Sequence, residues 1–117
     1  MTLRQCYALL DGDYEGVLGR MRKESLVEKF VLKFLNDPSM DALRQGIAAK
    51  DRETAFRAAH TIKGVAQNLG FTELYGAGSR LADELRESWS EEAPALAWQV
   101  EAAYQKTAAA ILAYQEG

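Results

Sequence analysis

The sequence predicts an all-α protein, an antiparallel (up-down) four-helix bundle with short extra helices at its N-terminus. Apolar residues recur at spacings of three and four throughout the 117 residues, and only two prolines interrupt the chain. No segment shows the apolar and polar alternation, bounded by turn residues, that is typical of a β-strand. Short connections between amphipathic segments favour antiparallel neighbours. We therefore expect a single helical domain over residues 1–117.

Two short helices are predicted first, over residues 3–10 and 14–21, with a break at residues 11–13. Thr2 and Gln5 have the spacing of a capping box at the start of the first helix. Both helices are too short to form a core alone, so we expect them to cover one end or side of the bundle.

The first longer helix is predicted over residues 25–36. Ser25 and Glu28 have the spacing of a second capping box. Four apolar residues of this helix are expected to form its buried stripe: Val27, Phe30, Val31 and Phe34. Either this helix or the next one, over residues 38–50, is expected to act partly as a cover for the bundle.

Three further helices, over residues 52–69, 72–88 and 93–115, are predicted to complete the bundle. Asp51 is a suitable N-cap for the first of them. Gly70 stands at the position where many helices end in the left-handed conformation.

Composition limits the classes of function. The net charge of −3 provides no positive footprint for nucleic acid or for an anionic membrane surface. The single cysteine, Cys6, excludes an internal disulfide and a multi-thiolate metal site. No apolar run approaches the roughly 20 residues that span a bilayer, and Met1–Gln5 lacks the pattern of a signal peptide. We expect a cytoplasmic monomer whose partners include neither nucleic acid nor membrane.

The predicted helix over residues 52–69 places the only histidine of the chain, His60, away from the core. On a helical wheel His60 points roughly 140° away from the apolar sector. That sector contains five residues: Ala55, Ala59, Ile62, Ala66 and Leu69. Three residues that follow His60, namely Lys63, Gly64 and Gln67, fall on its side of the helix, at spacings of three, four and seven. Phe56 lies at the edge of this exposed patch.

Gly64 makes the histidine more than an ordinary surface residue. A glycine inside a helix makes the helix less stable than an alanine would, by about 1 kcal/mol. Core packing does not explain a glycine that faces solvent. It supplies bare backbone beside the imidazole, where another protein could approach closely. For Phe56 a place at the boundary of the core is an equally good interpretation, and for Gln67 an ordinary surface position is.

Residues 60–70 read HTIKGVAQNLG. This segment resembles the phosphorylation-site helix of histidine-containing phosphotransfer (HPt) domains, which has the approximate pattern H-S/T-I/L/F-K-G-x-A/S-x-x-L/F-G. The resemblance implies that His60 is the phosphorylated residue and that Lys63 stabilises the charge of the phosphoryl group. It further implies that Gly64, with Gln67 and Phe56 as weaker candidates, contacts the partner.

The resemblance also implies a function, that of a phosphocarrier in a histidine–aspartate phosphorelay. His60 would accept a phosphoryl group, through Nε2, from an aspartate of a receiver domain and pass it to another receiver aspartate. The expected partners are the receiver domains of response regulators, with a hybrid histidine kinase as a further candidate. No metal or cofactor is expected on this chain, and Mg²⁺ is expected on the partner receiver. We expect no enzymatic activity, because the sequence lacks an ATP-binding pattern such as G-x-x-x-x-G-K-S/T.

Three alternatives remain open from the sequence. The chain could be an HPt-like module that docks to a receiver or kinase without being phosphorylated, although such a module would not need His60, Lys63 and Gly64 together. It could be an unrelated structural bundle, which leaves the surface glycine unexplained. An enzyme that uses His60 as a general base is the weakest option, because no acid or nucleophile stands at helical spacing from it.

Overall fold

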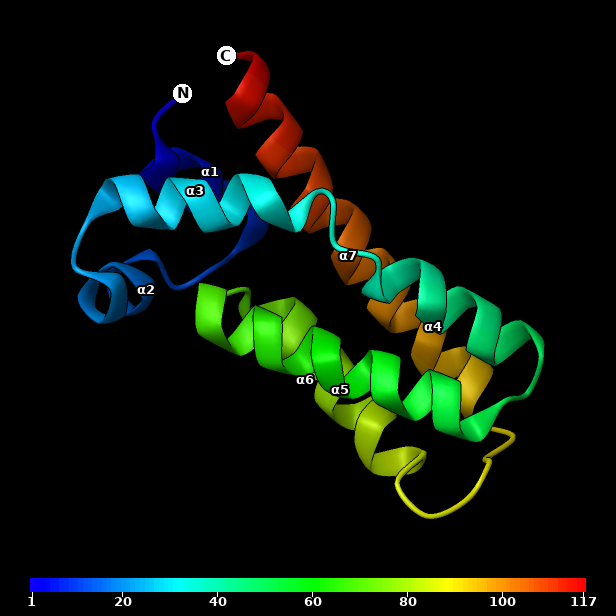
Figure 1. Ribbon diagram of the computed structural model, residues 1–117. Helices are drawn as coiled ribbons and strands as arrows, with labels where there is room; N and C mark the ends of the chain where they lie inside the picture. The colour runs from blue at the N-terminus through cyan, green and yellow to red at the C-terminus, as the bar shows by residue number, and fades with distance from the viewer.

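The computed structural model describes all 117 residues and consists of seven α-helices without a strand (Figure 1). The molecule is elongated, with extents of 41 × 26 × 19 Å along its principal axes. The predicted all-α class is confirmed. The helices are α1 (Leu3–Leu10), α2 (Tyr14–Met21), α3 (Glu24–Phe34), α4 (Ser39–Ala48), α5 (Arg52–Leu69), α6 (Thr72–Glu84) and α7 (Ala93–Glu116).

Helices α4 to α7 form the bundle. Each packs against the next one along the chain, and α7 returns to contact α4, which closes the group. Figure 1 shows α7 running the length of the molecule, from the bundle to the N-terminal helices. There it contacts α1 and, more sparsely, α3. Helix α3 is therefore the cover, and α4 belongs to the bundle. None of the helices is both long and apolar enough to cross a membrane.

Two glycines allow the neighbouring helices to approach the backbone of α5. A Cβ atom added to Gly46 of α4 would lie 2.7 Å from the backbone nitrogen of Ala55. A Cβ atom added to Gly78 of α6 would lie 3.4 Å from the backbone nitrogen of Lys63 and 3.6 Å from the carbonyl oxygen of Ala59. Since α5 is held at its backbone by both neighbours, its outward side is fixed in direction.

The two ends of α5 form as the sequence predicts. The carboxylate of Asp51 accepts hydrogen bonds from the backbone N–H of Thr54 at 3.2 Å and from its hydroxyl at 2.7 Å. These bonds, first of all the one from the hydroxyl, lower the pKa of Asp51. Gly70 ends the helix with a φ of 72°, a conformation that residues with a side chain rarely adopt.

The N-terminal helices close the C-terminal end of α5. The last carbonyl groups of a helix have no partner within it, and here those of residues 67–70 accept hydrogen bonds from the first 20 residues. Arg20 donates to the carbonyl oxygens of Gln67 and Asn68 at 3.0 and 2.9 Å. The hydroxyl of Tyr7 donates to the carbonyl oxygen of Leu69 at 2.6 Å, and the backbone N–H of Asp13 donates to that of Gly70 at 2.8 Å.

Helix α1 adds its own apolar side to the core. The predicted capping box of Thr2 and Gln5 is present at its start. Cys6 is fully buried, its thiol lies 3.5 Å from the carbonyl oxygen of Ala110 in α7, and burial raises the pKa of the thiol to about 11. The thiol is therefore protonated at neutral pH and acts as a small apolar group.

Two predicted details of α3 are wrong. The helix begins at Glu24, with Lys23 as its N-cap and no capping side chain, and the carboxylate of Glu28 instead accepts a hydrogen bond from the hydroxyl of Tyr114. Phe30 is 39% exposed and is not part of the core. Because α3 covers the bundle instead of being enclosed by it, only a narrow side of this helix is buried.

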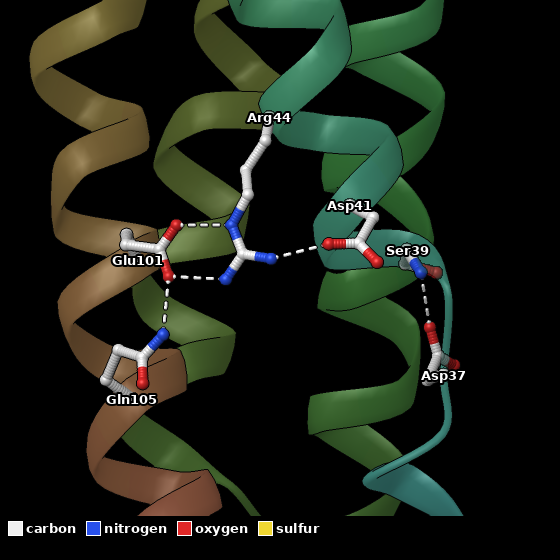
Figure 2. A network of polar contacts seen from close by, with 6 residues as sticks. All are labelled: Asp37, Ser39, Asp41, Arg44, Glu101 and Gln105. Atoms are coloured by element: carbon white, nitrogen blue, oxygen red, sulfur yellow. Dashed lines mark hydrogen bonds and ion pairs between the residues drawn. The ribbon is translucent and has the colours of Figure 1, made fainter.

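The other predicted helix ends agree with the structure within a few residues. Helix α4 begins at Ser39, whose backbone N–H donates to the carboxylate of Asp37 at 2.7 Å (Figure 2). Helix α6 ends at Glu84 and not at residue 88. The carbonyl groups of Leu85 and Arg86, just beyond this end, accept hydrogen bonds from the guanidinium of Arg52 in α5.

An ion-pair network joins α4 to α7, as Figure 2 shows. The guanidinium of Arg44 donates two hydrogen bonds to the carboxylate of Glu101, at 2.8 and 2.7 Å, and one to Asp41 at 2.6 Å. Gln105 donates a further bond to Glu101 at 2.9 Å. The hydrogen bonds from Arg44 lower the pKa of Glu101. The Arg44–Glu101 pair therefore links α4 to α7, the first and last helices of the bundle.

Candidate functional site

The predicted site residues lie on the outward side of α5. His60, Gly64 and Gln67 are exposed, whereas Phe56 and Lys63 are half-buried. The opposite side of the helix is buried through six residues: Ala55, Ala58, Ala59, Ile62, Ala66 and Leu69. One helix thus brings the whole predicted patch together, and the imidazole stands outside the core.

The direction of side chains on a helix explains how this patch is arranged. Helical side chains lean toward the N-terminus, over the residues three and four positions earlier. The imidazole of His60 accordingly stacks on the ring of Phe56, with the ring centroids 5.9 Å apart and the planes at 24°. A side chain at position 64 would lean over His60 in the same way.

Gly64 leaves that second position empty. Apart from its two chain neighbours and the backbone of its own helix, a Cβ atom built on Gly64 would meet no atom within 4 Å, so no other part of the chain fills the space beside it. The imidazole is therefore covered by Phe56 on its N-terminal side and uncovered on its C-terminal side. An approaching group of another protein could reach the ring from the direction of Gly64.

Lys63 lies one turn after His60, and side chains of a helix generally lean toward its N-terminus. None of the ion pairs of the molecule includes Lys63. Asp83 of α6 is close enough that Lys63 contributes to the lowered pKa of its carboxyl group, after the larger effect of a hydrogen bond from Arg86. No ion pair therefore holds the ammonium group of Lys63.

Two arginines beside the site were not identified from the sequence. The guanidinium carbon of Arg52 lies 5.5 Å from the ring centroid of Phe56, and that of Arg86 lies 5.8 Å from it. Arg52 stands four residues before Phe56, a spacing that could have revealed it. Arg86 follows α6, and no local pattern places it next to α5.

Gln67 lies two turns beyond His60. Its backbone carbonyl is bound by Arg20, while its side chain is exposed. No three histidine, cysteine, aspartate or glutamate side chains come together as a set of metal ligands.

The groove beside α5 on its α3 side has a volume of about 390 Å³. Its apolar lining includes Phe30, Phe34, Val65 and Leu69, and Asn68 lies beside them. The exposed ring of Phe30 thus forms a groove wall instead of filling the core. This groove was not part of the predicted site.

Comparison with known proteins places the chain in a family. Residues 33–110 match the sequence model of the Hpt domain. Neither the curated proteins nor the solved structures gave a match to the chain. The matched segment is more than half of the 117 residues, begins near the end of α3, and contains α4, α5 with the His60 patch, α6 and most of α7. The chain therefore belongs to the Hpt domain family.

Proposed function

We propose that this chain is a phosphocarrier that accepts a phosphoryl group on His60 from the aspartyl phosphate of one receiver domain and passes it to the aspartate of another. Hpt domains carry phosphoryl groups on histidine in phosphorelays, where they interact with receiver domains, so the general class follows from the family match. One observation carries the assignment to His60. The only histidine of the chain is exposed in the middle of α5, next to the open space at Gly64.

The proposed step is an in-line displacement at phosphorus. A neutral imidazole keeps a lone pair on one ring nitrogen, and Nε2 of His60 would use it to attack the phosphorus atom of the aspartyl phosphate. The P–N bond forms as the P–O bond to the aspartate breaks, and the carboxylate leaves with the electron pair of that bond. Transfer to the next receiver is the same step in reverse.

The rest of the patch would assist by position and charge. Phosphoryl transfer depends mainly on alignment and on stabilisation of the oxygens that carry charge. The ammonium of Lys63 would stabilise the phosphoryl oxygens. Gly64 would admit the receiver, and Gln67 would contact it. Mg²⁺ would belong to the receiver, whose acidic residues would hold it.

The test is transfer from a phosphorylated receiver domain to the purified chain. We expect the wild type to gain phosphate that is labile in acid and stable in alkali, as phosphohistidine is. His60→Gln should gain none while keeping the circular dichroism spectrum and melting temperature of the wild type, because an exposed side chain contributes little to stability.

Two results would contradict the proposal. A His60→Gln variant that still carries acid-labile phosphate would place the phosphorylation site elsewhere. A wild-type chain that binds receivers but never gains phosphate would favour the alternative of a docking module without phosphorylation.

A further inference from the structure

A column of side chains on α5 ends at the proposed phosphorylation site. Arg52, Phe56 and His60 follow one another at intervals of four residues, and each leans toward the one before it. The guanidinium carbon of Arg52 lies 5.5 Å from the ring centroid of Phe56. The ring centroids of Phe56 and His60 lie 5.9 Å apart. The next position in this α5 column is Gly64, where no side chain follows.

The ring of Phe56 is itself held in place. It packs against the core from the boundary. Arg52, on one side of it, donates hydrogen bonds to the carbonyl oxygens of Leu85 and Arg86, at 2.6 and 3.0 Å. Arg86, which also lies over the ring, donates to the carboxylate of Asp83 at 2.9 Å. Both guanidinium groups are therefore anchored to the end of α6, and the aromatic ring has a fixed surface to offer to His60.

We propose that Phe56 is a positioning residue for phosphoryl transfer: its ring restrains the His60 imidazole by stacking, so that the attacking nitrogen is presented on the side of Gly64. An exposed histidine without such a neighbour would be distributed over several staggered rotamers. The inference rests on the proposed function and deepens it. It also differs from a role of Phe56 in contacting the partner, because restraint of the imidazole acts on the rate of transfer and a partner contact acts on affinity.

The experiment compares Phe56→Leu, which keeps an apolar side chain but removes the ring, with Phe56→Tyr, which keeps the ring. Single-turnover transfer from a phosphorylated receiver is measured over a range of receiver concentrations. We expect Phe56→Leu to lower the limiting rate about 2- to 10-fold, the range that corresponds to a lost aromatic pair. Its half-saturating receiver concentration should not change. Phe56→Tyr should retain the wild-type rate.

Two measurements separate positioning from a general loss of structure. The proton NMR signals of the His60 ring should move in Phe56→Leu, because the ring current of Phe56 is lost, and should stay near the wild-type values in Phe56→Tyr. Trp98→Leu is the matched control, since it removes a 75% exposed aromatic ring from α7. We expect it to change neither the rate nor the His60 signals.

Each outcome decides the inference. A Phe56→Leu variant with the wild-type limiting rate, or with only a raised half-saturating concentration, overturns the positioning role while leaving the proposed function intact. A loss of rate in Phe56→Leu without any change in the His60 signals also overturns it. A wild-type chain that accepts no phosphoryl group overturns the proposed function first, and the inference with it.

Discussion

At the scale of single residues, Gly64 is the position where local stability and surface shape conflict most clearly. A glycine in the middle of a helix is less favourable than alanine by about 1 kcal/mol, and the space around Gly64 is empty, so a side chain would fit without a clash. The helix would be more stable with almost any other residue there. A glycine at this position leaves one side of the His60 imidazole uncovered.

Gly64→Leu is predicted to raise or maintain the melting temperature and to slow phosphoryl transfer by about tenfold or more, because the leucine side chain would lean over His60. Thermal unfolding and single-turnover transfer measure the two effects. Gly19 of α2 is a matched control, since a Cβ atom there also meets nothing within 4 Å. Gly19→Leu should change stability in the same direction without slowing transfer. Equal transfer by the Gly64→Leu variant and the wild type would remove the role given to Gly64.

Lys63→Gln is predicted to slow transfer by about tenfold, since a charged donor to the phosphoryl oxygens is replaced by a neutral one. Lys63→Arg should recover part of the rate. The melting temperatures should stay close to that of the wild type, because Lys63 makes no ion pair. If Lys63→Gln transfers at the wild-type rate, the ammonium group is only a solvated side chain.

At the scale of elements, α5 shows which parts of the structure follow from local sequence. Its N-cap at Asp51, its end at Gly70 and its buried side could be predicted, because capping and the 3.6-residue period depend on neighbours along the chain. The exposed patch with His60 followed from the same period. The position of Arg86 could not be predicted, because it depends on how α6 packs against α5.

Helix α3 illustrates the opposite case. Its apolar residues have helical spacing, and the sequence alone treats Phe30 like Val27 and Val31. The structure buries the two valines and leaves Phe30 39% exposed, because α3 covers the bundle along a narrow side only. The width of a buried stripe depends on how many neighbours a helix has, and periodicity does not contain that number.

The contacts of Arg20 lead to a prediction for the end of α5. Arg20→Ala removes the donor to the carbonyl groups of Gln67 and Asn68. We expect a loss of about 1 kcal/mol in the free energy of unfolding and faster hydrogen exchange of the backbone amides in the last turn of α5. Arg22→Ala is the control, since that exposed arginine of the same segment makes no side-chain bond. Unchanged exchange in Arg20→Ala would mean that water replaces the guanidinium without loss.

At the scale of the whole molecule, the Arg44–Glu101 pair gives the stability of the bundle a dependence on pH. The pKa of Glu101 is lower in the folded protein than its ordinary value of 4.5. The stabilisation is therefore complete above the unfolded value and is lost as the pH falls through the folded value. Because Arg44 is 42% exposed, screening by solvent limits the contribution to about 1 kcal/mol or less.

Glu101→Gln is predicted to lower the free energy of unfolding by up to about 1 kcal/mol at pH 7. The difference from the wild type should shrink as the pH is lowered below 4.5. Urea titrations at several pH values measure this difference. Glu87→Gln, which changes an exposed carboxylate without an ion pair, should show no such difference at any pH. A constant difference between Glu101→Gln and the wild type across this range would exclude the ion pair as its cause.

The N-terminal helices have a consequence for how a minimal fragment of this protein should be chosen. The segment that matches the family begins at residue 33, yet the side chains that donate to the carbonyl groups of Gln67, Asn68 and Leu69 precede it, as does the backbone donor to Gly70. Trimming the chain to the matched segment would also uncover the apolar surface that Leu3 and Tyr7 now shield. We therefore expect the smallest fragment that folds to extend beyond residues 33–110.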